Sequence, residues 1–151
     1  ARAALRLRLA AAWGALGCST PHPPLHGETM RVEADLFSGR PNPVWTLDAA
    51  EEGEVARLLR TLRPGGPSPR PPGLGYRGMM LRGLSAALPG CAELRLFHGA
   101  GVAECDGEHR TFTDPDRAVE RWLAASGRRR LDAELFQVLH AELERDPGPH
   151  P

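Results

Sequence analysis

The residues best suited to contact a ligand lie at positions 38–45, which read SGRPNPVW. The guanidinium of Arg40 can hold a carboxylate through two hydrogen bonds, and the indole of Trp45 can stack on a sugar or a peptide. Asn42, the only asparagine of the chain, supplies an amide that both donates and accepts. Two prolines fix their own φ and favour extended geometry for Arg40 and Asn42, which predicts a stiff, non-helical loop. These residues therefore form a candidate binding loop.

A second stretch can complete this site. Tyr76, the only tyrosine of the chain, and Arg77 offer a further ring and a further cation if the fold brings them near the loop. A structural interpretation stands beside the functional one, because rigid proline-rich turns also serve architecture. In that interpretation the indole belongs to the core, the amide caps the turn, and Arg40 pairs with Asp35 or with a helix C-terminus.

Three motifs carry a resemblance to a family of small proteins from GC-rich bacteria. They are FSGRPNPVW at 37–45, LGYRG at 74–78 and ERWL at 120–123. The resemblance covers about residues 30–145, and the first motif is its most specific part. It implies a single self-contained domain and indicates no reaction or ligand.

Known catalytic signatures are missing from the chain. It has no Gly-x-Ser-x-Gly elbow, no glycine-rich phosphate loop, no His-Glu-x-x-His and no Cys-x-x-Cys. Cys105 with His98 or His109 could form a nucleophile pair, but a thiol near a strand end is typical of packing. His22 and His26 are weak metal ligands in a proline-rich segment that cannot be helical. We therefore predict no catalytic residue, no metal and no cofactor.

Three functional hypotheses follow. The first is a non-enzymatic binding domain whose partner is a peptide, a glycan or a protein. The second is an enzyme of hydrolase or transferase type that uses Asp35, Arg40 or His98 in one cleft. The third is a cytoplasmic partner-binding module. Nineteen basic residues are matched by nineteen acidic ones, and this balance argues against nucleic-acid binding.

The first 29 residues allow two interpretations. Residues 1–18 resemble a lipoprotein signal, with three arginines, an apolar run and Cys18 as the candidate lipidation site. Residues 19–29 would then be a tether, and the protein would be exported and membrane-anchored through the lipid. The run is too short for a transmembrane helix. Alternatively, translation starts at Met30 and the protein is cytoplasmic.

Periodicity and capping residues predict one α+β domain at 30–145, followed by a disordered tail at 146–151. Alternation predicts a strand at 30–37, and helices begin at capping residues Asp48, Asp114 and Asp132. Further strands are predicted at 78–84, at 92–98, and at 102–105 with 109–113, where Asp106-Gly107 indicates a hairpin turn. The order β-α-β-β-β-α-α indicates a mainly antiparallel sheet of about four strands packed against two or three helices.

The two cysteines of this domain are predicted to be free. A hairpin that turns at residues 99–101 would place Cys105 opposite residue 95, four residues from Cys91. That is about 13 Å along a strand, whereas a disulfide needs Cα atoms within about 7 Å. We therefore expect two buried thiols.

Overall fold

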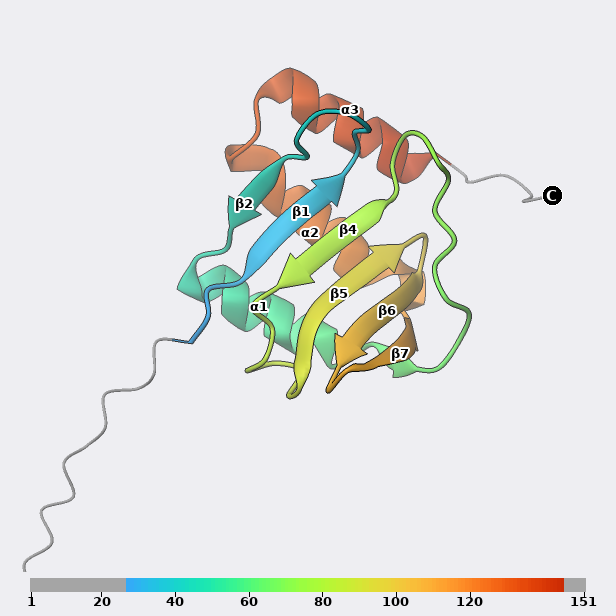
Figure 1. Ribbon diagram of the computed structural model, residues 1–151. Coiled ribbons are helices and arrows are strands. Elements are labelled where there is room, and N and C mark those ends of the chain that lie inside the picture. The colour runs from blue at the N-terminus through green and yellow to red at the C-terminus, as the bar shows by residue number, and fades with distance from the viewer. Residues whose placement is uncertain (1–26, 146–151) are drawn as a thin grey trace, which may run out of the picture.

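Seven strands form one open antiparallel sheet, and the helices pack against one face of it (Figure 1). The computed structural model describes residues 27–145. The strands run in the spatial order β2-β1-β4-β5-β6-β7-β3. The elements are β1 (Arg31–Asp35), β2 (Val44–Thr46), α1 (Ala49–Leu59), β3 (Arg63–Pro64), β4 (Gly78–Arg82), β5 (Cys91–Phe97), β6 (Ala100–Cys105), β7 (Glu108–Thr113), the 3-10 turn η1 (Pro115–Arg117), α2 (Ala118–Ser126), the 3-10 turn η2 (Gly127–Arg129) and α3 (Ala133–Glu144).

Local sequence explains where α1 and α3 begin. The carboxylate of Asp48 accepts from the backbone N–H of Glu51, and the Glu51 carboxylate accepts from the N–H of Asp48, which is a complete capping box. Asp132 caps α3 by accepting from the backbone N–H of Leu135. Both predicted caps are therefore confirmed.

The core lies between the helices and the inward face of the sheet. Alternate residues of β1 point into it, as the period of two predicts, while Glu33 lies on the opposite face. The largest fully buried apolar side chains come from strands and helices alike: Val32, Val55, Leu59, Met79, Leu81, Leu84, Leu94, Leu96, Val119, Leu123 and Leu139. One apolar cluster therefore joins the sheet to all three α-helices.

The predicted α+β class with a mainly antiparallel sheet is confirmed. The sheet is wider than the sequence indicates, because β2 and β3 add edge strands of three and two residues. Strands as short as β2 and β3 carry too little periodicity to be recognised in the sequence. The hairpin predicted at Asp106-Gly107 is confirmed, because β6 and β7 pair directly across this turn.

The prediction of free thiols is wrong: Cys91 and Cys105 form a disulfide, with their Cα atoms 3.9 Å apart. Two local features shift the register from the one expected. The β5–β6 turn consists of His98 and Gly99, because Phe97 pairs with Ala100. A bulge between Cys91 and residue 93 then brings Cys91 directly opposite Cys105.

Several predictions fall outside the described residues. The signal peptide with Cys18, most of the tether, and the tail at 146–151 belong to this group. Within residues 27–145, no helix has the length and apolar character needed to cross a bilayer.

Candidate functional site

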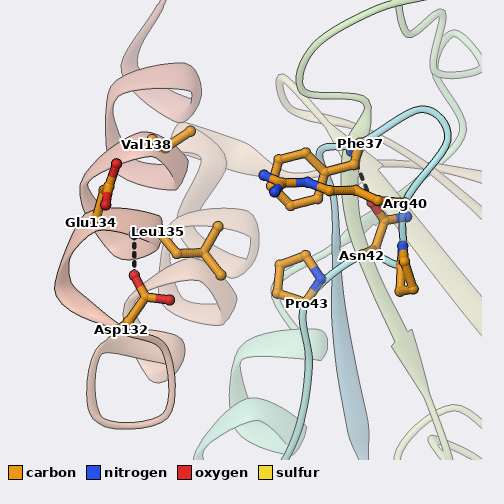
Figure 2. Close-up of a pocket in the computed structure, with 9 residues that line it drawn as sticks. Phe37, Arg40, Asn42, Pro43, Asp132, Glu134, Leu135 and Val138 are labelled. Carbon is orange, nitrogen blue, oxygen red and sulfur yellow. Dashed lines mark hydrogen bonds between the residues drawn. The ribbon is translucent and has the colours of Figure 1, made fainter.

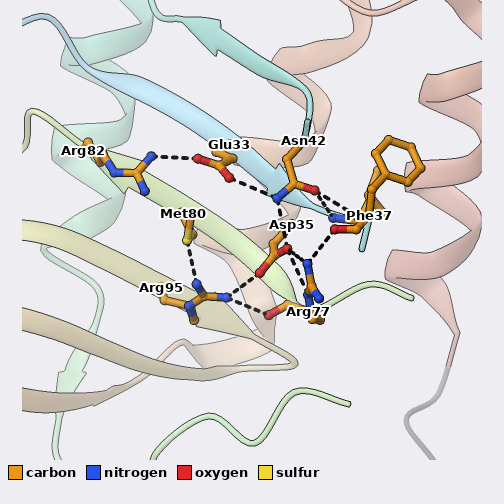
Figure 3. Close-up of polar contacts among 9 residues, drawn as sticks. Glu33, Asp35, Phe37, Asn42, Arg77, Met80, Arg82 and Arg95 are labelled. Atoms are coloured by element: carbon orange, nitrogen blue, oxygen red, sulfur yellow. Dashed lines mark hydrogen bonds and ion pairs between the residues drawn. The ribbon is translucent and has the colours of Figure 1, made fainter. Parts of the chain in front are cut away.

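Asn42 fastens the loop between β1 and β2 to the end of β1 (Figure 3). Its Oδ1 accepts from the backbone N–H groups of Leu36 and Phe37, at 3.0 and 2.9 Å. Its Nδ2 donates to Glu33 Oε1 at 3.1 Å and to Asp35 Oδ1 at 3.0 Å. A side-chain amide suits this position because it has two donor hydrogens on one atom and an acceptor on another, whereas an aspartate here would place a third carboxylate beside two others. This clamp explains the single asparagine of the chain.

Asp35 is the centre of the polar cluster beside this clamp. Arg77 donates to its Oδ1 from both Nε and a terminal nitrogen, and Arg95 donates to Oδ2 at 2.8 Å. Burial alone raises the pKa of Asp35, but hydrogen bonds from Arg77, Arg95 and Asn42 outweigh it and hold that pKa below its ordinary value. Arg77 also donates to the carbonyl oxygen of Phe37 at 2.7 Å. The predicted site residue Arg77 is therefore engaged inside the fold.

The same face of the sheet carries a second bridge. Arg82 donates to Glu33 and to Glu93, each at 2.7 Å. Arg95 also contacts the sulfur of Met80, which lies beneath these charges and is nearly buried. Counting Asp35 and Arg77, the cluster contains three guanidinium and three carboxylate groups. Its charges are balanced internally, so it offers little attraction to an ionic ligand.

Trp45 and Tyr76 lie in the core rather than on a contact surface. Trp45 is 4% exposed, and its indole Nε1 donates to Ser126 Oγ at 2.8 Å. Tyr76 is 3% exposed, and its hydroxyl donates to Glu120 Oε1 at 2.6 Å. Burial, followed by the charge of Glu120, raises the pKa of Tyr76 well above its ordinary value. For Trp45 and Asn42 the structural interpretation describes what is observed.

Arg40 and Phe37 form the outward side of the loop. The Arg40 guanidinium lies 3.5 Å from the centre of the Phe37 ring, a cation–π stack that orders an exposed side chain. The expected pairing with Asp35 is taken by Arg77 and Arg95 instead. Within residues 27–145, Arg40 forms no salt bridge.

A groove of about 410 Å³ separates this stack from the first half of α3 (Figure 2). We call it the Arg40 groove. Its apolar surface comes from Phe37, the prolines, Leu135 and Val138, whose side chain is 43% exposed. Carboxylates lie on the α3 wall, opposite the cation. The lining residues are Phe37, Arg40, Pro41, Asn42, Pro43, Asp132, Glu134, Leu135 and Val138.

Sequence reasoning missed a buried polar cluster around Glu120, although the motifs at 74–78 and 120–123 contain two of its members, Tyr76 and Glu120. This side chain has no exposed surface, yet it accepts from the Tyr76 hydroxyl, from the N–H groups of His98 and Gly99, and from Arg117 Nε. It ties the β5–β6 turn to the start of α2. On the sequence, Glu120 lies in an ordinary amphipathic helix, and only the long-range contact with Tyr76 reveals its role.

Asp114 supports the same region. Its carboxylate accepts from the N–H groups of Val119 and Glu120, at 3.1 and 2.9 Å, so it caps α2 across the 3-10 turn η1. Burial raises the pKa of Asp114, against the lowering effect of these hydrogen bonds. The predicted capping role is therefore present, although the helix begins later than Pro115.

The candidates for catalysis do not meet at the groove. Cys105 is bonded to Cys91, so neither of these two cysteines offers a nucleophilic thiol in this form. Neither Asp35 nor His98 lines the Arg40 groove. In residues 27–145, no three His, Cys, Asp or Glu side chains are grouped to hold a metal ion. His22 and His26 lie outside the described residues.

Comparison with protein-family models, with curated proteins and with solved structures found no match to this chain. The family resemblance of the three motifs therefore stays a prediction. The fold and the side-chain geometry alone carry the functional argument.

Proposed function

We propose that this protein is a non-enzymatic binding domain that takes a carboxylate-bearing, partly apolar ligand in the Arg40 groove. The observation that carries the proposal is a contrast between Arg40 and the three arginines of the polar cluster. Arg77, Arg82 and Arg95 are each paired with internal carboxylates, whereas Arg40 stacks on Phe37 at the wall of the groove. An ordered, unpaired guanidinium is ready to bind a carboxylate through two hydrogen bonds.

The other lining residues narrow the ligand class. Leu135, Val138 and the prolines favour an apolar body next to the carboxylate. A glycan partner is less favoured, because the indole of Trp45 that would stack on a sugar is buried. A peptide or a protein segment provides both features. Asn42, Trp45, Tyr76 and Arg77 then act behind the site by holding the loop.

Nuclear magnetic resonance titration of the full chain tests this proposal. The probes are acetyl-Leu-Leu with a free carboxylate and the same dipeptide as a C-terminal amide. The acid should shift the backbone signals of Arg40, Leu135 and Val138, and the amide should shift them far less. Arg40→Gln should remove the difference, while Arg60→Gln, at an exposed arginine that ends α1, should preserve it. Equal shifts with acid and amide would contradict the proposal.

We also propose that the protein is exported and tethered through Cys18, with a cytoplasmic form starting at Met30 as the alternative. The Cys91–Cys105 disulfide supports export, because such bonds persist in oxidising compartments and are rare in the cytoplasm. Intact-mass measurement on protein isolated from its native cells under thiol-blocking conditions separates the two forms. A lipid on Cys18 with an oxidised pair supports export, and an unlipidated chain with free thiols supports the alternative.

A further inference from the structure

Within residues 27–145, the backbone groups on the outer edge of β2 have no hydrogen-bond partner. Pro43 O accepts from Ala34 N at 3.1 Å, and Leu47 N donates to Met30 O at 3.0 Å. In an antiparallel ladder alternate residues face the partner strand, so Trp45 also faces β1. The N–H and C=O groups of Val44 and Thr46 therefore point away from the sheet. This edge offers two donors and two acceptors at the spacing of a strand.

The opposite edge of the sheet is protected, and β2 is not. There, β3 covers the end of β7, and Gly65 N donates to Thr111 O. The uncovered start of β7 carries the charged side chains Glu108 and Arg110, which discourage pairing with another chain. By contrast, β2 has no charged residue, and Val44 is 42% exposed. Only its short length limits strand addition.

The β2 edge and the Arg40 groove are continuous along the chain. Pro43 lines the groove and directly precedes β2, which runs away from it (Figure 2). A segment added antiparallel to β2 runs toward the groove, and its C-terminal end arrives beside Arg40. A parallel segment would bring its N-terminal end there, where a cation is unfavourable for an amine. Strand direction decides which end of the segment reaches the groove, and the Arg40 cation favours the antiparallel segment, whose carboxylate end lies on the Arg40 side, across the groove from Asp132 and Glu134.

We infer that the ligand is an extended polypeptide segment that adds antiparallel to the edge of β2 and places a carboxylate at its C-terminal end against Arg40. This inference rests on the proposed function, since it names the ligand class of the same groove. The carboxylate comes either from the chain terminus or from a terminal Asp or Glu side chain. Main-chain pairing supplies affinity, and the groove supplies selection for the acidic end.

Because the β2 edge is short, strand pairing and the contact of the carboxylate with Arg40 must act together. Two outward-facing residues can form only a few hydrogen bonds, and each contributes modestly in water. Strand pairing alone would therefore be weak and unselective. The stacked cation adds a charge-assisted contact at one end, which fixes both direction and register.

The test uses acetyl-Thr-Val-Thr-Val-Leu with a free carboxylate and the full chain, followed by calorimetry and magnetic resonance. Two backbone-methylated versions remove amide protons from alternate residues, one set facing β2 and the other facing solvent. One version should bind about tenfold or more weakly, and the other should bind within about threefold of the parent. The C-terminal amide should lose binding, and an amidated peptide ending in Glu shows whether a side-chain carboxylate restores it.

Protein variants test the edge from the other side. Val44→Pro removes an outward N–H and leaves the ladder to β1 unbroken, whereas Val44→Ala keeps the N–H and serves as the matched control. Val44→Pro should weaken binding about tenfold, and Val44→Ala should change it little. The methylated peptides preserve the test if Val44→Pro fails to fold, because they leave the protein unaltered.

The outcomes separate this inference from the proposed function. If Arg40→Gln abolishes binding but neither alternate methylation matters, the groove binds a carboxylate and strand addition is refuted. If Arg40→Gln has no effect as well, the proposed function fails too. Sedimentation that shows a dimer weakened by Val44→Pro would mean that a second copy occupies the edge, and it would overturn the inference.

Discussion

The two sides of the loop between β1 and β2 differ in what their side chains contact. On the inward side, both polar side-chain atoms of Asn42 and the indole N–H of Trp45 have partners within the fold. On the outward side, Arg40 contacts the Phe37 ring and faces a groove. The inward side fixes the loop, and the outward side uses that rigidity to hold a cation in place.

This difference shows that one short motif serves two purposes. Hydrogen bonds that close on each other inside the fold stabilise it but leave nothing for a ligand. A guanidinium that is exposed and stacked on a ring contributes little to folding, because solvent screens its charge. Mutations on the two sides should therefore separate stability from binding.

Asn42→Ala should produce the largest effect of the series. The change removes four hydrogen bonds and leaves the N–H groups of Leu36 and Phe37 partly buried without an acceptor. We expect the free energy of unfolding to fall by about 3 kcal/mol, as measured by urea denaturation. Asn42→Asp serves as the control for shape, and it should be nearly as harmful because it adds charge beside Glu33 and Asp35. A loss below about 1 kcal/mol for Asn42→Ala would contradict the clamp.

Trp45→Phe should have the next largest effect. The smaller ring loses the bond to Ser126 Oγ and leaves space near Gly127, against which the indole packs. We expect a loss of about 2 kcal/mol in unfolding free energy, from thermal or urea denaturation. Trp122→Phe is the matched control, since Trp122 is only partly buried on α2. An equal loss in both variants would show that the buried position of Trp45 contributes no more to stability than the partly buried position of Trp122.

Asp35 should make the inward side sensitive to acid. Its pKa is lower in the fold than its ordinary value of 3.8, so its contribution to stability is complete above that value. The contribution is lost as the pH falls through the lowered pKa, because protonation breaks the contacts with Arg77 and Arg95. The pKa of Asp114 is raised in the fold, so its contribution to the unfolding free energy has the opposite sign and increases as the pH falls.

The measurement is the unfolding free energy of wild type and Asp35→Asn between about pH 5 and pH 2.5. The variant should be less stable at the upper end, by about 2 kcal/mol, and its stability should fall less steeply with acid. Glu54→Gln is the control, because its partner Arg57 forms only an exposed pair within α1. Parallel pH curves for wild type and Asp35→Asn would rule out the Asp35 contribution.

Sequence reasoning succeeded where the cause was local. The caps at Asp48 and Asp132, the alternation of β1 and the non-helical proline loop all depend on neighbouring residues. It also identified Arg40 and Asn42 as members of one loop. It could not decide which of these would face inward, because Asn42 depends on the positions of Glu33 and Asp35 after folding.

The failures came from register and from distant contacts. The β5–β6 turn is one residue shorter and lies earlier than expected, which moves the position opposite Cys105 from residue 95 to residue 92, and the bulge then brings Cys91 opposite Cys105. Each shift is small, but a cross-strand bond depends on their sum. Tyr76 was a candidate to complete the Arg40 site if the fold brought it near, but it bonds to Glu120, 44 residues away in the sequence. No local pattern encodes such a pair.

Arg40→Gln should have the smallest effect on stability and the clearest effect on binding. The change removes a cation–π contact at an exposed site, so we expect a loss of about 0.5 kcal/mol or less in unfolding free energy. Binding of the free-acid peptide should fall to the level of its amide, as followed by calorimetry. Arg77→Gln completes the comparison and should lower the unfolding free energy more than Arg40→Gln, because Arg77 bonds Asp35 and the Phe37 carbonyl. If Arg40→Gln destabilised the fold as much as Arg77→Gln, the outward cation would belong to the architecture, and the division between the two sides of the loop would be lost.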